Sequence, residues 1–293
     1  MITRRRMLSI LAGATALPLA GTATANTQTW RGVALGAEAR IVLDHPKAET
    51  LLPLAVSEIH RLEHIFSLYQ NDSELSRLNR QGMLTSPSQE MVELLSIVGR
   101  VHTQTKGAFD PTIQPLWALY AQSYAKGAAP TEAEIQTAKS ITGWNNIRFD
   151  SAQVAFNQQG MALTLNGIAQ GYIADKVAAL LRANGVHEAL VNTGEIVGLG
   201  DWPVQTPAER LALSNQAVAT SAIRGTGFDQ AGKVGHILDP RTGLPATENN
   251  TVSVVSQSAA IADGLSTGFC ILPRDKVEAA MRNMPDGSRV IFG

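Results

Sequence analysis

The sequence predicts an α+β fold with a largely antiparallel sheet and packed helices. Strand patterns cluster between Glu188 and Ser256, where Gly- and Pro-rich turns separate them, and they do not alternate regularly with helices. The sequence also lacks a G-x-G-x-x-G phosphate loop that opens a helix. Both observations argue against a doubly wound dinucleotide-binding fold, in which strands and helices alternate along the chain.

The first half of the chain is predicted to form a hairpin and three helices. Residues 30–44 alternate well enough in polarity to form two strands, with Gly36 near the turn. Apolar residues at helical spacing predict amphipathic helices over residues 51–66 and about 88–105. The segment Pro130-Thr131-Glu132-Ala133-Glu134 is a capping box, which predicts the start of a short helix.

The second half of the chain is predicted to begin with two or three short strands between Ile147 and Leu165. A helix is expected over roughly residues 168–183, because the Asn184-Gly185 pair that follows is a typical helix end. Beyond the strand-rich segment, the sequence predicts helices near residues 258–272 and 274–284 and a closing strand over residues 289–292.

The first 25 residues have the pattern of an export signal. Three arginines at positions 4–6 precede an uncharged apolar run from Leu8 to about Ala20, and Ala23-Thr24-Ala25 matches the small-x-small pattern that signal peptidase accepts. The Thr-Arg-Arg-Arg-Met-Leu segment resembles the twin-arginine consensus of proteins that are exported folded, and it favours that route over an ordinary Sec signal. The apolar run is too short to span a bilayer stably. We therefore expect cleavage near Ala25.

Residues 26–293 are expected to form a single domain in the periplasm. Removing residues 1–25, which contain three arginines and no acid, changes the formal net charge from −1 to −4. This acidic balance gives no reason to expect a nucleic-acid partner, which requires a basic face. The single cysteine, Cys270, cannot form an intramolecular disulfide and is expected to be a buried small hydrophobic residue.

The segment Ala262-Asp263-Gly264-Leu265-Ser266-Thr267 contains a candidate cation site. On a helix, Asp263 and Thr267 are four residues apart and therefore point the same way. A carboxylate and a hydroxyl on one face suit Mg²⁺ or Ca²⁺, which prefer oxygen ligands, and do not suit zinc. The same spacing also occurs by chance on solvated helix faces, so a surface role stays open at this point.

Two further segments have features that are typical of ligand sites. His236 precedes the turn Asp239-Pro240-Arg241-Thr242-Gly243, which by itself requires no histidine, so a polar role and a structural role are both open. Gly167 and Gly171 lie at a predicted strand-to-helix junction, where a helix N-terminus favours phosphate oxygens. A tight turn explains these two glycines about equally well.

In combination these segments resemble the ApbE family. The resemblance rests on Gly-Ile-Ala-x-Gly-Tyr, His-Ile-x-Asp-Pro-x-Thr-Gly and Ala-Asp-x-x-Ser-Thr, which begin at Gly167, His236 and Ala262. Other family motifs occur in the same order, namely Glu63, Ser67 and Tyr69, then Ser73 to Asn79, Gly107 to Thr112 and Val191 to Gly194. The likeness covers nearly the whole mature chain and implies an ApbE-like, T-fold-like domain.

The resemblance implies an enzyme that binds FAD and Mg²⁺ and transfers FMN to a Thr or Ser hydroxyl of an acceptor flavoprotein, releasing AMP. Asp263, Thr267 and the backbone carbonyl of Ala169 would hold the metal. His236 and Asp263 would be catalytic, with His236 either deprotonating the acceptor hydroxyl or orienting the leaving group. The residues implied in binding FAD are Tyr69, Asp110, Gly167, Gln170, Asn192, Thr193, Gly194, Glu195, Thr220, Ser221, His236 and Thr242.

The sequence departs from the family pattern around the flavin. Gln170 stands where the family usually has Lys, which removes a positive charge near the phosphates. Thr164-Leu165-Asn166 replaces Asp-x-Gly, and Thr220-Ser221-Ala222 replaces Thr-Ser-Gly. The usual Asn-x-Gly-Gly-Asp is one Gly shorter here and ends in Glu195. Together with the twin-arginine segment, these changes resemble the NosX-type branch associated with nitrous oxide reductase maturation.

Three functions are compatible with these residues. The leading hypothesis is a transferase that acts on an exported or membrane flavoprotein. The second is an Mg²⁺-dependent FAD pyrophosphatase, in which water attacks in place of a protein hydroxyl. The third is an exported FAD-binding accessory protein without turnover, which Gln170 and the shortened loop before Glu195 favour.

Overall fold

The α+β prediction is confirmed by the computed structural model, which describes residues 15–16, 27–229, 231–282, 284–285 and 287–293. Its central element is a seven-stranded sheet in the order β13-β12-β11-β8-β7-β3-β2, in which neighbouring strands are antiparallel. The strands of this sheet are β2 (Thr27–Ala34), β3 (Ala37–Asp44), β7 (Ala189–Asn192), β8 (Ile196–Leu199), β11 (Ala217–Ala222), β12 (Thr251–Ser256) and β13 (Arg289–Phe292).

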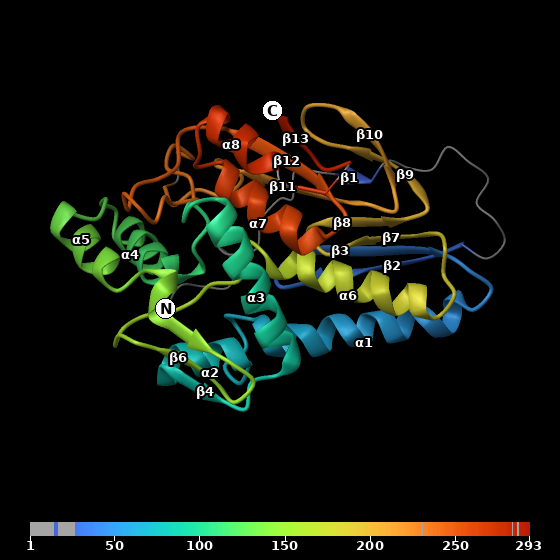
Figure 1. Ribbon diagram of the computed structural model, residues 1–293, viewed down its shortest axis with the longest axis horizontal. Coiled ribbons are helices and arrows are strands. Elements are labelled where there is room, and N and C mark those ends of the chain that lie inside the picture. Colours follow the sequence, from blue (N-terminus) through green and yellow to red (C-terminus); the bar gives the residue numbers. More distant parts are fainter. Residues whose placement is uncertain (1–14, 17–26, 230, 283, 286) are drawn as a thin grey trace.

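Three helices cover one face of the central sheet (Figure 1). They are α1 (Ala48–Phe66), α6 (Ala169–Ala183) and α7 (Ala259–Phe269). α1 contacts β2 and β3, α6 contacts β7 and β8, and α7 contacts β11 and β12. α6 and α7 also contact each other, and this pair of helices positions the candidate site described below.

The opposite face of the sheet is covered by a hairpin formed by β9 (Asp201–Gln205) and β10 (Arg210–Ser214). Because successive side chains of a strand point to opposite faces, Val42 packs in the core under this hairpin, whereas Ile41 packs in the helix-covered core. Trp202 of β9 is almost completely buried in the same hairpin core. Both faces of the central sheet are therefore covered.

The remaining elements lie at the side of the helical layer (Figure 1). They are α2 (Glu74–Gln81), α3 (Gln89–Gln104), α4 (Gln114–Ala125), α5 (Glu132–Ser140), α8 (Arg274–Met281), the 3-10 helices η2 (Pro111–Ile113) and η3 (Trp144–Asn146), and a small sheet of β4 (Met83–Thr85), β5 (Ile147–Phe149) and β6 (Gln153–Phe156). α4 and α5 pack around a core of their own, which includes Leu116, Tyr120 and Ile135 and is separate from the main core.

Local sequence signals account for the elements that were predicted well. Leu35 and Gly36 form the turn of the first hairpin, with φ of 47° and 85°, as expected for a two-residue hairpin loop. The capping box is present: the Thr131 hydroxyl accepts from the Glu134 N–H, and the Glu134 carboxylate accepts from the Thr131 N–H. Gly185 has a φ of 83° just beyond the end of α6.

The short strands expected between Ile147 and Leu165 are β5 and β6. Other expected elements differ in the structure: residues 223–250 form a loop whose described part has only two isolated bridges. The loop contains many Gly and Pro residues, which weaken or interrupt a strand ladder. α7 ends at Phe269, not near residue 272, and α8 ends at Met281, not near residue 284.

The end of α7 is stabilised by a buried side chain from the loop before β12. Asn249 Nδ2 donates hydrogen bonds of 2.8 Å to the carbonyl of Phe269 and to that of Leu272 in the segment after α7. The Phe269 carbonyl is one of the acceptors that the end of a helix leaves without an intrahelical partner. Cys270, the residue after α7, is fully buried as expected, and burial raises the pKa of its thiol to about 12. The sequence pattern could not show this contact, because Asn249 is twenty residues away from Phe269.

The predicted export signal lies outside the described residues, except for Thr15–Ala16. The backbone of these two residues forms β1, which pairs antiparallel with β9. Within the part of the chain that the structure describes, no helix has the length and apolar character needed to cross a membrane. Cleavage and export stay predictions.

Candidate active site

A cavity of about 910 Å³ lies at the start of α6 and is lined by segments that are far apart in the sequence. Its walls come from α4, the segment before α6, α7 and the loop between β11 and β12. The structure brings ten of the predicted site residues together in this cavity: Tyr69, Asp110, Gly167, Gln170, Glu195, Thr220, Ser221, His236, Asp263 and Thr267.

Asp263 and Thr267 lie one turn apart on α7 and both line the cavity. Asp263 is only 3% exposed, so it does not lie on a solvated helix face. Its Oδ2 atom accepts a 3.1 Å hydrogen bond from the N–H of Gly171 in α6. Burial raises the pKa of Asp263 to about 8, although this hydrogen bond acts in the opposite direction. Thr267 Oγ1 lies 3.1 Å from the hydroxyl of Ser221.

Glu195 is a second buried carboxylate in the cavity wall. Its Oε2 atom accepts a 3.0 Å hydrogen bond from the N–H of Thr220. Burial and the charge of Asp263 both raise the pKa of Glu195 well above its usual value. Among the described residues, neither Glu195 nor Asp263 forms an ion pair with a basic side chain.

The donor set of this cavity fits a hard divalent cation. Two carboxylates and the Thr267 hydroxyl supply the oxygen atoms that Mg²⁺ prefers. A bound cation would offset the mutual repulsion of Asp263 and Glu195. In the described part of the chain, no three His, Cys, Asp or Glu side chains could hold a metal ion together. A site here would therefore be completed by hydroxyl, backbone or substrate oxygens.

His236 reaches the cavity from the loop between β11 and β12. Its Nδ1 atom lies 2.9 Å from the carbonyl oxygen of Thr226. Since a carbonyl oxygen only accepts hydrogen bonds, Nδ1 carries the proton and Nε2 is left as an acceptor. Burial lowers the pKa of His236 below its usual value, so the ring is neutral at pH 7 and can take up a proton.

Gln170 presents a buried hydrogen-bond donor that has no partner among the described residues. Its side chain is 4% exposed and lines the cavity, and its Nε2 atom makes no hydrogen bond to any residue that the structure describes. The amide packs against Gly194, where an added Cβ would lie 2.6 Å from Nε2. Burying an amide without a partner costs free energy. The Gln170 amide is therefore suited to donate a hydrogen bond to a ligand in the cavity.

The other predicted residues do not line the cavity. Ala169 is fully buried at the first position of α6. Asn192, Thr193 and Gly194 form the turn behind Gln170, in which the Thr193 hydroxyl donates to the Gln170 carbonyl at 2.8 Å. Thr242 lines a second hollow on another part of the surface. Asp110 does line the cavity, but its carboxylate accepts hydrogen bonds from Thr112 and from the Trp144 N–H.

Most of the aromatic side chains that line the cavity were not predicted as site residues from the sequence. Phe109, Trp117 and Phe228 line it together with the partly exposed Tyr69. The rings of Trp117 and Phe228 pack edge to face, with centroids 5.4 Å apart. The spacing of Trp117, Tyr120 and Tyr124 along α4 was a helical signal that could have been found. Phe228 lies in a loop, and no periodic pattern identifies it.

Replacing Gly171 by Ala is expected to lower the free energy of unfolding by about 1–3 kcal/mol, the usual range for overpacking. An added Cβ would collide with the backbone carbonyl of Ala259, so α6 and α7 would have to separate. Urea unfolding measures this loss. Gly99→Ala in α3 is the matched control, because its Cβ would meet Trp144 at 3.6 Å in ordinary contact. An equal effect of both substitutions would contradict the close packing of α6 on α7.

The architecture is that of solved ApbE proteins. The apo flavinyl transferase ApbE of Pseudomonas stutzeri superposes with a TM-score of 0.77 over 91% of this chain and 94% of that structure, at 24% identity. The ApbE protein of Thermotoga maritima gives a TM-score of 0.77 at 26% identity, with 91% of this chain and 94% of that structure covered.

The chain belongs to the ApbE family, which matches residues 35–292. An FAD:protein FMN transferase of Salmonella typhimurium is 28% identical over 93% of this chain and 86% of its own length. One from Klebsiella pneumoniae is 29% identical over 81% of this chain and 80% of its own length. The family resemblance inferred from the sequence motifs is thereby confirmed.

Proposed function

We propose that this protein is an FAD:protein FMN transferase, which moves FMN from FAD to a Ser or Thr hydroxyl of an acceptor flavoprotein and releases AMP. The observation that carries the proposal is the meeting of Asp263, Thr267 and His236 in one cavity. Its support is membership of the ApbE family and the names of the related transferases.

The reaction breaks the phosphoanhydride bond of FAD and forms a phosphoester. The acceptor oxygen attacks the phosphorus of the FMN half, the bond to the AMP oxygen breaks, and the acceptor proton must be removed. In such phosphoryl transfers a protein contributes mainly positioning and charge neutralisation. Mg²⁺, held by Asp263 and Thr267 with Glu195 nearby, would supply neutralisation of the pyrophosphate charge.

His236 can take the acceptor proton. Its Nδ1–H is fixed by the Thr226 carbonyl, so Nε2 is available in the neutral ring. The hydrogen bond also holds the ring in one tautomer, as a general base requires. The aromatic residues Tyr69, Trp117 and Phe228 offer apolar surfaces for the ring systems of FAD.

The test is to incubate the purified protein with FAD, Mg²⁺ and a peptide that carries the Ser/Thr acceptor motif, and to weigh the peptide by mass spectrometry. A mass gain of one FMN less water is the expected result. AMP release with an unmodified peptide would support an FAD pyrophosphatase in place of the transferase. Bound FAD with neither product would support an FAD-binding accessory protein.

Gln170→Leu is expected to stabilise the ligand-free protein while it weakens FAD binding. The unpartnered Gln170 amide should cost about 1–3 kcal/mol, and Leu removes it without leaving a cavity. Loss of one hydrogen bond to FAD should raise the dissociation constant about tenfold. Chemical unfolding and FAD fluorescence titration measure the two effects. Unchanged FAD affinity would show that Gln170 does not contact the substrate.

The proposal also places the reaction in the periplasm. Its support is the arginine-containing segment at residues 4–6 and the apolar run that follows it. The acceptor would then be an exported or membrane flavoprotein. Fractionation of cells that produce the full chain tests this, with replacement of Arg5 and Arg6 by Lys as the variant expected to stay inside.

A further inference from the structure

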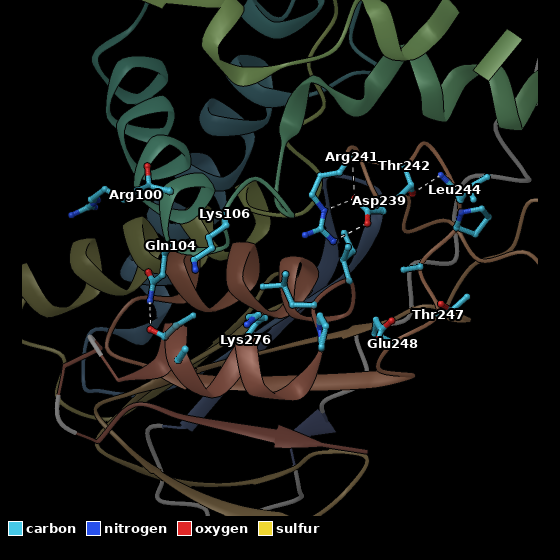
Figure 2. A pocket seen from close by; sticks show the side chains of 18 of the residues that line it. Arg100, Gln104, Lys106, Asp239, Arg241, Thr242, Leu244, Thr247, Glu248 and Lys276 are labelled. Atoms are coloured by element: carbon cyan, nitrogen blue, oxygen red, sulfur yellow. Dashed lines mark hydrogen bonds and ion pairs between the residues drawn. The ribbon is translucent and has the colours of Figure 1, made fainter. Parts of the chain in front are cut away.

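A second hollow of about 1290 Å³ lies between α3, the loop at residues 239–248 and the junction of α7 with α8 (Figure 2). Four basic residues line it: Arg100, Lys106, Arg241 and Lys276. We call this hollow the basic groove. It takes no part in the chemistry assigned to the cavity of Asp263 and His236.

The basic groove carries unpaired positive charge. Two of the four basic residues are paired, Arg241 with Asp239 at 2.8 Å and Lys276 with Asp275 at 3.0 Å, and the groove is also lined by Glu248. Within the described chain, Arg100 and Lys106 form no ion pair, and both are exposed. Since the whole chain has a formal net charge of −1, this concentration of basic groups is a local feature that attracts an anionic partner.

The basic groove and the candidate active site share a wall. Along one segment, Leu238 and Pro240 line the active-site cavity, whereas Asp239 and Arg241 line the groove. Ile271, after α7, lines both hollows. A ligand in the groove therefore lies directly across this wall from the site that holds His236.

The lining of the groove favours a polypeptide over a nucleotide. No aromatic side chain lines it within the described part of the chain, so it offers no surface on which a base could stack. Ala246, Leu272 and Ala280 provide apolar lining between the basic residues. Apolar contacts framed by complementary charges are typical of protein–protein interfaces.

We propose that the basic groove binds an acidic segment of the acceptor protein, next to the Ser or Thr that receives FMN. This inference rests on the proposed function, because it assumes that the second substrate is a protein. Arg100 and Lys106 supply the charge that selects the segment. The shared wall brings the neighbouring hydroxyl close to the active-site cavity.

The test uses two fluorescently labelled peptides of equal length that carry the same Thr motif. One has Asp and Glu on both sides of the motif, and the other has Asn and Gln at those positions. Anisotropy titration with the full chain, without FAD, measures their affinities. The acidic peptide is expected to bind at least about tenfold more tightly, and less so at high salt.

A double charge reversal, Arg100→Glu with Lys106→Glu, is expected to abolish this difference between the peptides. The matched control is Lys47→Glu with Arg148→Glu, two exposed basic residues that line neither hollow. The control protein should keep the preference. Equal affinity of the wild-type protein for both peptides, or an equal loss in the control, would overturn the proposal.

Transfer kinetics separate this proposal from the proposed function. The groove variant should show a raised KM for the acidic peptide, with an unchanged KM for the neutral one and an unchanged dissociation constant for FAD. Transfer to both peptides with the same KM in wild type and variant would support the transferase activity and contradict peptide binding in the groove. Binding of the acidic peptide through the groove without FMN transfer would support the groove as a binding site and contradict the transferase activity.

Discussion

Asp263→Asn should lower FMN transfer by at least about 100-fold. Loss of a residue that only hydrogen-bonds to a metal ligand already costs up to about 100-fold, and loss of the ligand itself should cost at least as much. Asp263 is the carboxylate of α7 that lines the cavity beside Thr267. The amide keeps the shape of the carboxylate and can still accept from the Gly171 N–H, but it removes the charge that would hold a cation. AMP release and peptide modification measured across a Mg²⁺ series test this expectation.

The fold of the Asp263→Asn protein is the control for this experiment. Because burial disfavours ionisation of the Asp263 carboxyl, and Asn is a neutral group of equal size that does not ionise, the metal-free variant should be at least as stable as wild type. Mg²⁺ should raise the Tm of the wild-type protein and leave that of the variant unchanged. Retained activity, or an equal Tm shift in both proteins, would show that Asp263 does not bind the metal.

His236→Ala should slow FMN transfer by about 10²–10⁴-fold, the usual contribution of a general base. The affinity for FAD should change far less, because in the proposed reaction the Nε2 atom acts on the acceptor proton and not on the bound flavin. Single-turnover transfer and FAD titration measure the two quantities separately. Equal losses in both would make His236 a binding residue.

The pH dependence of the wild-type protein gives a second measure of His236. Burial lowers the pKa of this ring below 6.5, so the neutral form persists to lower pH than in free histidine. Transfer should therefore rise with pH on an acid limb whose midpoint lies below 6.5, and stay constant through pH 7. A midpoint above 6.5 would contradict a buried neutral base at this position.

Much of the fold was predictable because its signals are local. The Thr131–Glu134 capping box and the Leu35-Gly36 turn act within a few residues, and both formed as expected. α2 and α4 were not predicted: α2 is short and polar, and α4 carries apolar residues around much of its circumference. The strand order of the central sheet depends on pairing between distant segments, which no local pattern specifies.

The candidate site likewise has features that follow from local sequence signals and features that depend on the three-dimensional fold. Asp263 and Thr267 share a helix, so their common direction follows from spacing alone. No comparable spacing rule predicts where the side chains of an irregular loop point. Thr242 was therefore predicted to bind FAD together with His236, although it lines the basic groove. The rise in the pKa of Glu195 comes from its burial and from the charge of Asp263, and both depend on the three-dimensional fold, so the sequence does not reveal them.

The separate core of α4 and α5 has a consequence for how a large substrate enters. Trp117 belongs to this small core, whereas Asp263 lies on a helix of the main core. A unit with a smaller core opens at lower free energy than the body to which it is attached. We therefore expect the part that carries Trp117 to open more readily than the helix that carries Asp263, so that backbone amides of α4 and α5 exchange with deuterium before those of α6 and α7. If FAD binds in the proposed cavity and contacts both parts, it should slow that exchange.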